Sequence, residues 1–268
     1  MSSRRDILLD ELGLTPVWRL RARTGAVIEP AALVYETPVY EAPVDETNAR
    51  APALGGAANP PKSDRGDRGD RTERILRMDW PALKQAVAAC DACDLHKSRN
   101  KTVFGVGDEK ADWLLIGEAP GAEEDARGEP FVGQAGQLLD NMISAIGLAR
   151  GQNVYISNVL KCRPPGNRNP EPFEVAQCSP HLARQISLIQ PKLILAMGRF
   201  AVQTLLGTGA TIASLRGRLH SYQGVPLLVT YHPAYLLRSL ADKAKAWEDL
   251  CLARQTMQDL SSGTGSEH

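Results

Sequence analysis

Four of the five cysteines follow a pattern that suits a metal centre. Cys90 and Cys93 are separated by two residues, and two more thiols follow far downstream at Cys162 and Cys178. Four thiolates are the ligands of a tetrahedral zinc ion and also of an iron–sulfur cluster, and the spacing does not separate these two. The alternative is a set of scattered buried thiols, which leaves the close pair unexplained. We expect the centre to be structural rather than catalytic.

Two further residues bear on this centre. His96 lies near the Cys90–Cys93 pair and is a candidate substitute ligand, although four cysteines already fill a site. Cys251 shares a helical stripe with Trp247, Leu250 and Met257, which predicts a position in the core.

A second group of chemically capable side chains lies in the loop at 117–133, which contains Glu118, Glu124 and Phe131. The loop follows the apolar run 113–116, which predicts a short buried strand, and precedes a segment with helical periodicity. In an open α/β sheet, ligands bind where strands pass into helices. The alternative is an ordinary solvated connection.

The positions of these loops depend on the elements around them. Strands are expected at 113–117, 154–159, 193–197 and 227–231, and helices at 79–90 (with Asp79 as the N-cap), 134–147, 172–189, 199–206 and 241–260. This alternation predicts an α/β fold of three α/β/α layers around a central four-stranded, mainly parallel sheet. The loops after the strands, including Asn158 and His232, then meet at one edge.

The charges are unevenly distributed. The formal net charge is zero, yet neither 141–170 nor 175–241 contains an Asp or Glu. Such segregation can make one face basic and able to bind phosphates, the alternative being a solvated basic surface without a partner. The basic residues of these segments are Arg150, Lys161, Arg163, Arg168, Arg184, Lys192, Arg199, Arg216, Arg218 and Arg238.

The chain divides by composition. Residues 1–23 combine Trp18 with several leucines and predict a docking peptide. Residues 24–78 are rich in Ala, Pro and Gly, contain an Asp-Arg-Gly repeat at 64–71, and predict a disordered linker. The folded domain is expected at 79–260, with a disordered tail at 261–268. No signal peptide and no run near the roughly 20 apolar residues of a membrane span are evident, so we expect a cytoplasmic monomer without a membrane partner.

Several separate motifs, in order, resemble family 4 uracil-DNA glycosylases, the iron–sulfur enzymes of bacteria and archaea. They are Gly-Glu-Ala-Pro-Gly at 117–121, Pro-Phe-Val-Gly-x-Ala-Gly at 130–136, Asn-x-x-Lys-Cys-Arg-Pro-Pro-x-Asn-Arg-x-Pro at 158–170 and His-Pro-Ala-Tyr-Leu-Leu-Arg at 232–238. The resemblance covers about 80–260. It implies a uracil-DNA glycosylase-like fold, uracil-containing DNA as substrate, and a [4Fe–4S] cluster on Cys90, Cys93, Cys162 and Cys178.

The resemblance also implies roles for the pocket residues. Phe131 stacks on a flipped uracil, unless it is a core residue, and Asn158 bonds uracil N3–H and O4. His232 donates to uracil O2 as negative charge develops there. Glu118 orients the attacking water. Glu124 lines the pocket near uracil C5 and excludes a thymine methyl, the alternative being a solvated acid.

The DNA contacts implied by the resemblance flank this pocket. Leu236 and Leu237 suit a wedge that fills the vacated stack, although they could instead begin the core face of a helix. Tyr235 and Arg238 accompany the wedge, and Arg163 and Arg168 supply phosphate contacts from the basic loop after Asn158.

The sequence departs from related groups at two places. Better-known relatives carry Asp where this chain has Ala119, which the resemblance places in the pocket. Without that carboxylate, catalysis should depend on Glu118. The alternative is that it depends on the pocket and His232, with a smaller contribution from base catalysis. A covalently trapping sister group has an Arg-rich insertion ending in His after the Asn strand. Here 164–170 reads Pro-Pro-Gly-Asn-Arg-Asn-Pro, which predicts turnover instead of trapping.

The N-terminal 20 residues are similar to the start of the psi subunit of bacterial DNA polymerase III, which docks on the clamp loader. This resemblance implies a tether to the replication fork and hence to the bacterial nucleoid.

The rival function is a non-catalytic iron–sulfur DNA-binding adaptor, which would not need Phe131, Asn158 and His232. A phosphate-ester hydrolase is disfavoured because no Gly-x4-Gly-Lys loop or carboxylate metal cluster is evident.

Overall fold

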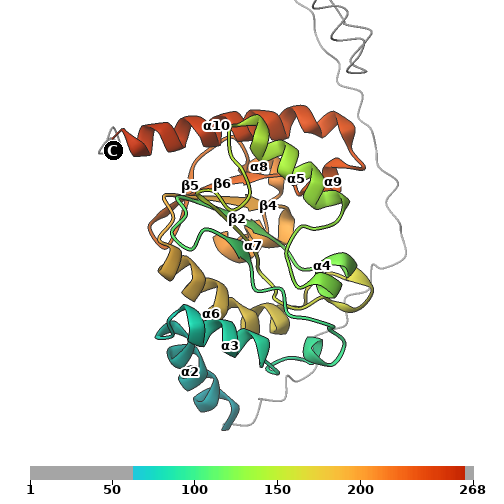
Figure 1. Ribbon diagram of the computed structural model, residues 1–268, viewed down its shortest axis with the longest axis vertical. Helices are drawn as coiled ribbons and strands as arrows, with labels where there is room; N and C mark the ends of the chain where they lie inside the picture. Colours follow the sequence, from blue (N-terminus) through green and yellow to red (C-terminus); the bar gives the residue numbers. More distant parts are fainter. Residues whose placement is uncertain (1–62, 263–268) are drawn as a thin grey trace, which may run out of the picture. The chain divides into compact units, whose positions relative to one another are not determined.

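The computed structural model describes residues 63–262 of the 268-residue chain (Figure 1). The expected docking peptide, the linker up to residue 62 and the tail from residue 263 lie outside the described residues. Within 63–262, no helix combines the length and apolar character needed to cross a membrane.

Six strands form one sheet in the order β1-β3-β2-β4-β6-β5. The four central strands are parallel and are the four that the sequence predicts: β3 (Val154–Asn158), β2 (Trp113–Gly117), β4 (Leu193–Met197) and β6 (Val225–Thr230). The sequence prediction omits two antiparallel edge strands, β1 (Val106–Gly107) and β5 (His220–Tyr222). Each edge strand is too short to show a clear apolar alternation.

Helices cover both faces of the sheet, which confirms the predicted three-layer α/β class (Figure 1). One face packs on α6 (Pro172–Ile189) and α7 (Arg199–Leu206), and the other on α5 (Gln134–Ala145) and α10 (Lys243–Ser261). All residues of β2, β3 and β4 are buried, as expected for strands covered on both faces. These four helices closely follow the predicted bounds.

Shorter elements shape the edge of the sheet. Helix α3 (Trp80–Ala88) begins as predicted after Asp79, whose carboxylate accepts a hydrogen bond from Ala82 N at 3.0 Å. The others are α4 (Ala122–Arg127), α8 (Ile212–Leu215), α9 (Pro233–Leu236) and the 3-10 turns η1 (Asp94–Lys97), η2 (Pro165–Asn167) and η3 (Leu240–Asp242).

The predicted linker is wrong at its C-terminal end. Residues Ser63–Leu76 form helix α2, which packs on α6 and buries Ile75. Arg71 also donates a hydrogen bond to the carbonyl of Gln177 on α6, at 3.0 Å. The composition of this segment is too polar to predict a helix that packs on the core. Its packing depends on one apolar side chain and on contacts with a helix about 100 residues away, and a local sequence pattern shows neither.

Candidate active site and thiol site

The largest described pocket, about 820 Å³ in volume, opens at the carboxyl ends of the parallel strands. Strand β2 pairs with β3 on one side and with β4 on the other, so the chain changes direction across the sheet here. Such a switch point is where open α/β sheets bind ligands. The structure brings nine of the predicted site residues to this pocket: Glu118, Ala119, Glu124, Phe131, Asn158, Arg168, His232, Tyr235 and Arg238.

The base of the pocket is built by close packing around Gly117. Gly117 and Asn158 are register partners at the ends of β2 and β3. A Cβ on Gly117 would lie 2.5 Å from Asn158 Oδ1 and 2.5 Å from Phe131 Cζ. Glycine is therefore required for these two side chains to stand next to each other.

Asn158 has an unsatisfied acceptor. Its side chain is buried, yet Oδ1 has no hydrogen-bond partner among the described residues. Leaving a buried acceptor unpaired costs about 1–3 kcal/mol. Because Asn158 lines the pocket, a ligand N–H that enters would recover this cost.

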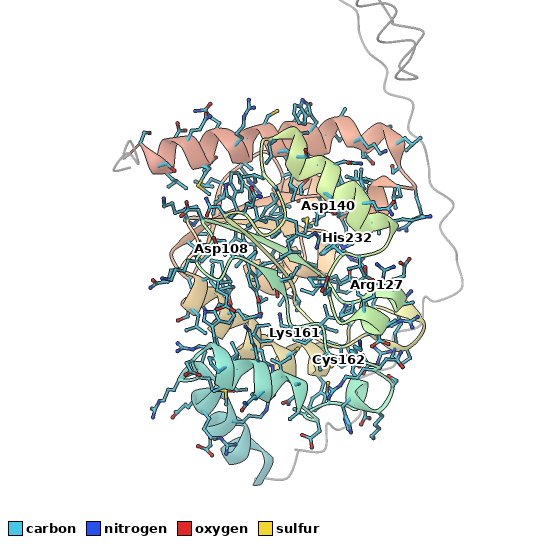
Figure 2. The ribbon with its side chains drawn as sticks, viewed as in Figure 1. Asp108, Arg127, Asp140, Lys161, Cys162 and His232 are labelled. Carbon is cyan, nitrogen blue, oxygen red and sulfur yellow. The ribbon has the colours of Figure 1, made fainter. Side chains whose placement is uncertain are left out.

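His232 is held as a neutral donor. Its Nδ1 accepts a hydrogen bond from Ala234 N at 3.1 Å, so the proton of the neutral ring resides on Nε2. Burial lowers the pKa of His232 to about 4, and the charge of Arg238 acts in the same direction. The ring stacks on Phe131, with centroids 5.4 Å apart, and Figure 2 shows His232 in the region of α5 and α9.

Two glutamates occupy different surroundings. Burial raises the pKa of Glu118, and the charge of Arg199 opposes this rise. Glu124 is not simply solvated, because Oε2 accepts a hydrogen bond from Gly121 N at 3.1 Å, and Oε1 accepts from the backbone N–H groups of Val132 and Gly133 at 2.9 and 3.1 Å. Glu124 therefore holds both ends of the loop that carries Phe131.

Arg150 supports the same loop from behind. Its guanidinium donates to the carbonyls of Pro130 and Phe131 at 3.0 and 2.9 Å and pairs with Asp140. Phe131 has a backbone φ of 55°, an uncommon value outside glycine. The loop conformation is thus maintained by hydrogen bonds from both Glu124 and Arg150.

The predicted wedge needs a correction. Leu236 is 1% exposed and belongs to the core that packs with α5 and α10, so it is unable to enter DNA. Leu237 is 40% exposed and Tyr235 38% exposed. The alternative reading of Leu236 as a core residue is the right one, because the helical turn α9 points successive side chains in different directions.

The basic residues divide between the pocket and internal bonds. Arg238 and Arg199 line the pocket, whereas Arg184 and Arg216 donate to backbone carbonyls. Arg168 also lines the pocket but pairs with Glu174 at 2.5 Å. Arg163 is absent from the pocket lining and donates to Asn167 Oδ1 at 2.8 Å.

Sequence reasoning missed several pocket residues. Arg199 is expected only as one of the basic residues, on a loop at this edge, and no site role is predicted for it, although it lies just after β4 and lines the pocket. Its guanidinium lies 4.7 Å from the ring centroid of Phe200. The segment 211–213 reaches the pocket only through the tertiary fold and carries no local signal.

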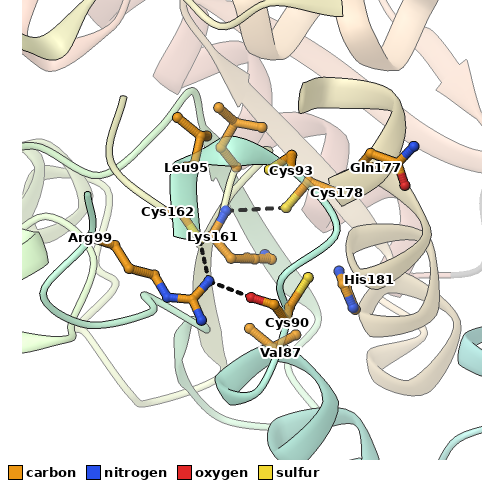
Figure 3. A pocket seen from close by; sticks show the side chains of 11 residues that line it. Val87, Cys90, Cys93, Leu95, Arg99, Lys161, Cys162, Gln177, Cys178 and His181 are labelled. Atoms are coloured by element: carbon orange, nitrogen blue, oxygen red, sulfur yellow. Dashed lines mark hydrogen bonds between the residues drawn. The ribbon is translucent and has the colours of Figure 1, made fainter. Parts of the chain in front are cut away.

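The four cysteines of the expected metal centre line one separate cavity (Figure 3). Burial raises the pKa of Cys93 and Cys162, and raises that of Cys178 to about 12. No Asp or Glu is among the described residues that line the cavity. His96 is absent from this lining, and its Nδ1 lies 2.8 Å from the carbonyl of Cys93. Cys251 is half-buried on α10, away from the other four.

Cationic side chains surround these thiols. Arg99 Nη1 donates to Cys162 Sγ at 3.2 Å and to the Cys90 carbonyl at 2.7 Å. Lys161 is fully buried, and its backbone N donates to Cys178 Sγ at 3.3 Å. A buried thiol loses its proton only where positive charge compensates the thiolate. These contacts place hydrogen-bond donors directly on the sulfur atoms of Cys162 and Cys178.

Lys161 also connects the thiol site with the pocket. Its Nζ donates to the Asn158 carbonyl, to Ser157 Oγ and to Gln185 Oε1, at 2.8, 2.6 and 2.6 Å. All three ammonium protons are satisfied by neutral acceptors. The residue thus fixes the backbone of Asn158 from the side of the cysteines.

The fold and the pocket define an α/β protein with a ligand site at a sheet switch point. A family model described as the uracil DNA glycosylase superfamily matches residues 104–251, and the chain belongs to this superfamily.

Curated relatives agree with this assignment. A protein of Archaeoglobus fulgidus named type-4 uracil-DNA glycosylase is 46% identical over 159 residues, 56% of this chain and 79% of the relative. Proteins with the same name from Pyrobaculum aerophilum and Sulfurisphaera tokodaii are 43% and 44% identical, over 65% and 58% of this chain and 93% and 74% of the relatives.

Proposed function

We propose that this protein is a monofunctional uracil-DNA glycosylase of the type-4 kind, which acts in base excision repair. It hydrolyses the bond between uracil N1 and deoxyribose C1′ and leaves an abasic site in DNA. The observation that carries the proposal is the combination of an unpaired acceptor on Asn158, a neutral His232 and the ring of Phe131 in one pocket.

Recognition follows from hydrogen-bond polarity. A uracil flipped out of the stack presents N3–H to Asn158 Oδ1 and O4 to the side-chain amide, while its ring stacks on Phe131. Cytosine has no proton at N3 and carries a donor at position 4, so both groups would be mispaired. Each mispaired group costs about 1–3 kcal/mol.

Cleavage then places negative charge on the base. As the N1–C1′ bond breaks, its electron pair passes to the uracil ring, and Nε2–H of His232 stabilises the charge at O2. Water attacks C1′ as Glu118 orients it and balances the positive sugar, and the proton that the water loses is finally taken up by the departing uracil anion. Ala119 leaves space beside Glu118 and contributes no carboxylate of its own.

The thiol cavity suits a [4Fe–4S] cluster held by Cys90, Cys93, Cys162 and Cys178. When bound, such a cluster supplies a covalent connection between the segment after α3 and the segment after β3. Its support here is the donor set: four thiols around one cavity with cationic neighbours and no lining carboxylate among the described residues. Among residues 63–262, no three His, Cys, Asp or Glu side chains are arranged to hold a single metal ion.

The N-terminal part of the proposal concerns a partner. Residues 1–23 dock on the DNA polymerase III clamp loader and keep the enzyme near newly incorporated dUMP. The support is the sequence resemblance alone. Deleting residues 1–25 should abolish co-purification with the clamp loader, and unchanged binding would reject this part without affecting the glycosylase.

The deciding experiment for the activity uses a uracil-containing oligonucleotide, followed by alkali to break the strand at abasic sites. We expect cleavage with repeated turnover and no covalent protein–DNA product. DNA binding without cleavage would favour the adaptor function instead. Visible absorption of the purified protein, with iron analysis, tests the cluster separately.

Replacing Gly117 with alanine should lower kcat/KM on this substrate by about 100-fold, because the new Cβ displaces Asn158 and Phe131. The matched control is Gly209→Ala, where a Cβ meets nothing within 4 Å. Activity of Gly117→Ala equal to that of Gly209→Ala would show that the pocket tolerates the displacement and contradict the proposed base site.

The two adjacent leucines should behave differently. Leu236→Ala is expected to lower the free energy of unfolding by about 2–5 kcal/mol, since the side chain is buried. Leu237→Ala should change stability by less than about 0.5 kcal/mol and reduce activity on double-stranded DNA more than on single-stranded DNA. Denaturant unfolding measures the stability of each variant, and assays on single- and double-stranded DNA measure its activity. An equal loss of activity on the two substrates would argue against a wedge at Leu237.

A further inference from the structure

Helix α2 reaches the thiol site although it lies before the family-matched region. Arg71 on α2 donates through Nη2 to Cys90 Sγ at 3.5 Å and through Nη1 to the carbonyl of Gln177 at 3.0 Å. Gln177 precedes Cys178 on α6, and both line the thiol cavity. One guanidinium therefore connects two of the segments that carry the cysteines.

The helix holds Arg71 in this position. Ile75, one helical turn after Arg71, is 3% exposed, and α2 contacts α6. Just beyond the helix, the Met78 carbonyl accepts a hydrogen bond from Arg184 of α6 at 2.5 Å. These two anchors, both on the C-terminal side of Arg71, reduce the entropy cost of fixing its long side chain.

The contact completes a pattern around the thiols. Cys162 receives a hydrogen bond from Arg99, Cys178 receives one from the backbone of Lys161, and Cys90 receives one from Arg71. Hydrogen bonds to ligand sulfur stabilise the thiolate form, and solvent exposure and hydrogen bonding control the properties of an iron–sulfur centre. Arg71 is the donor in this set that comes from the segment whose composition suggests a linker.

We propose that α2 is an integral part of the metal site and that Arg71 is a positioning residue, which holds the Cys90 thiolate and slows loss of the bound centre. The inference rests on the proposed [4Fe–4S] cofactor. It assigns a role to Arg71, a residue that the glycosylase reaction leaves unused.

The test compares full-length proteins purified without oxygen: wild type, Arg71→Leu, Arg71→Lys and Arg74→Leu. Arg74 is the matched control, because it lies on the same helix and is exposed. Its guanidinium forms a long, exposed ion pair with Asp70 at 3.8 Å. The readouts are iron per chain and the rate at which visible absorption disappears in air with an iron chelator. Neither depends on glycosylase activity.

We expect Arg71→Leu to lose absorption about 10-fold faster than wild type or more, and Arg74→Leu to match wild type. Arg71→Lys should be intermediate, since one ammonium keeps the charge but does not reproduce the forked contact. Equal rates for wild type and both Arg71 variants would overturn the inference. A wild-type protein without iron would instead reject the proposed cofactor. If Arg71→Leu fails to fold, the comparison of Arg71→Lys with wild type decides: a faster loss of absorption supports the role of Arg71, and an equal rate overturns it.

Discussion

His232→Ala is expected to lower the single-turnover rate on uracil-containing DNA by about 10²–10³-fold. The variant removes the Nε2–H donor that faces the charge developing on uracil O2, and the loss of one such donor in a preorganised site has this size. Binding of the oligonucleotide should change much less, because its phosphate contacts are untouched.

A second variant separates catalysis from folding. His232 also caps α9, since its Nδ1 accepts a hydrogen bond from Ala234 N. His232→Asn retains an acceptor suited to an N-cap but has no donor at the Nε2 position. We expect His232→Asn to keep the melting temperature and still lose the rate, and a nearly normal rate in this variant would refute the role of Nε2–H.

The same residue determines a pH dependence. Its pKa is lowered from 6.5 to about 4, mainly by burial, so the neutral ring, the form proposed to act in cleavage, persists above about pH 4. Because the folded pKa lies below the unfolded one, the stability contributed by the neutral ring is complete above pH 6.5 and declines as the pH falls toward 4. The rate for wild type should therefore show no titration of His232 between pH 5 and 8.

Asn158→Ala is expected to have the second large effect, a loss of about 100-fold or more in kcat/KM for uracil. The variant removes both the acceptor for N3–H and the donor for O4, each worth about 1–3 kcal/mol. Inhibition by free uracil should weaken in parallel, which separates loss of base reading from loss of DNA binding. Measurements of kcat/KM and of the inhibition constant test both effects.

The control for Asn158 is the same substitution at an exposed asparagine. Asn141 lies on α5 and is absent from the pocket lining. We expect uracil inhibition close to wild type in Asn141→Ala. If Asn158→Ala kept its sensitivity to free uracil, Asn158 would not be the residue that reads the base.

Local patterns in the sequence predict much of this protein. The apolar runs of β2 and β4 locate the central strands, because strands covered on both faces have few polar residues. The order of strands and helices then places Glu118, Asn158 and His232 at one edge of the sheet. The edge strands β1 and β5 escape prediction because each has too few residues to form a pattern.

Contacts between distant segments decide the remaining features. Glu124 appears in the sequence as one acid among several, and only the fold brings Val132 and Gly133 to its carboxylate. Leu236 and Leu237 are identical in type and adjacent, yet one is buried and the other exposed, because packing against α5 and α10 selects one direction.

The cysteines show the division most clearly. Their number and spacing, together with the family resemblance, determine which four residues to expect at a metal centre. The tertiary fold makes them line one cavity, where the Arg71 and Arg99 side chains and the backbone N–H of Lys161 donate to three of the thiols. The sequence by itself therefore determined the reactive groups and the parallel sheet, since these follow from local composition and order. Only the tertiary structure decided the proton position on His232, which of the two leucines is exposed, and the contact of α2 with α6, because each depends on contacts that no local pattern records.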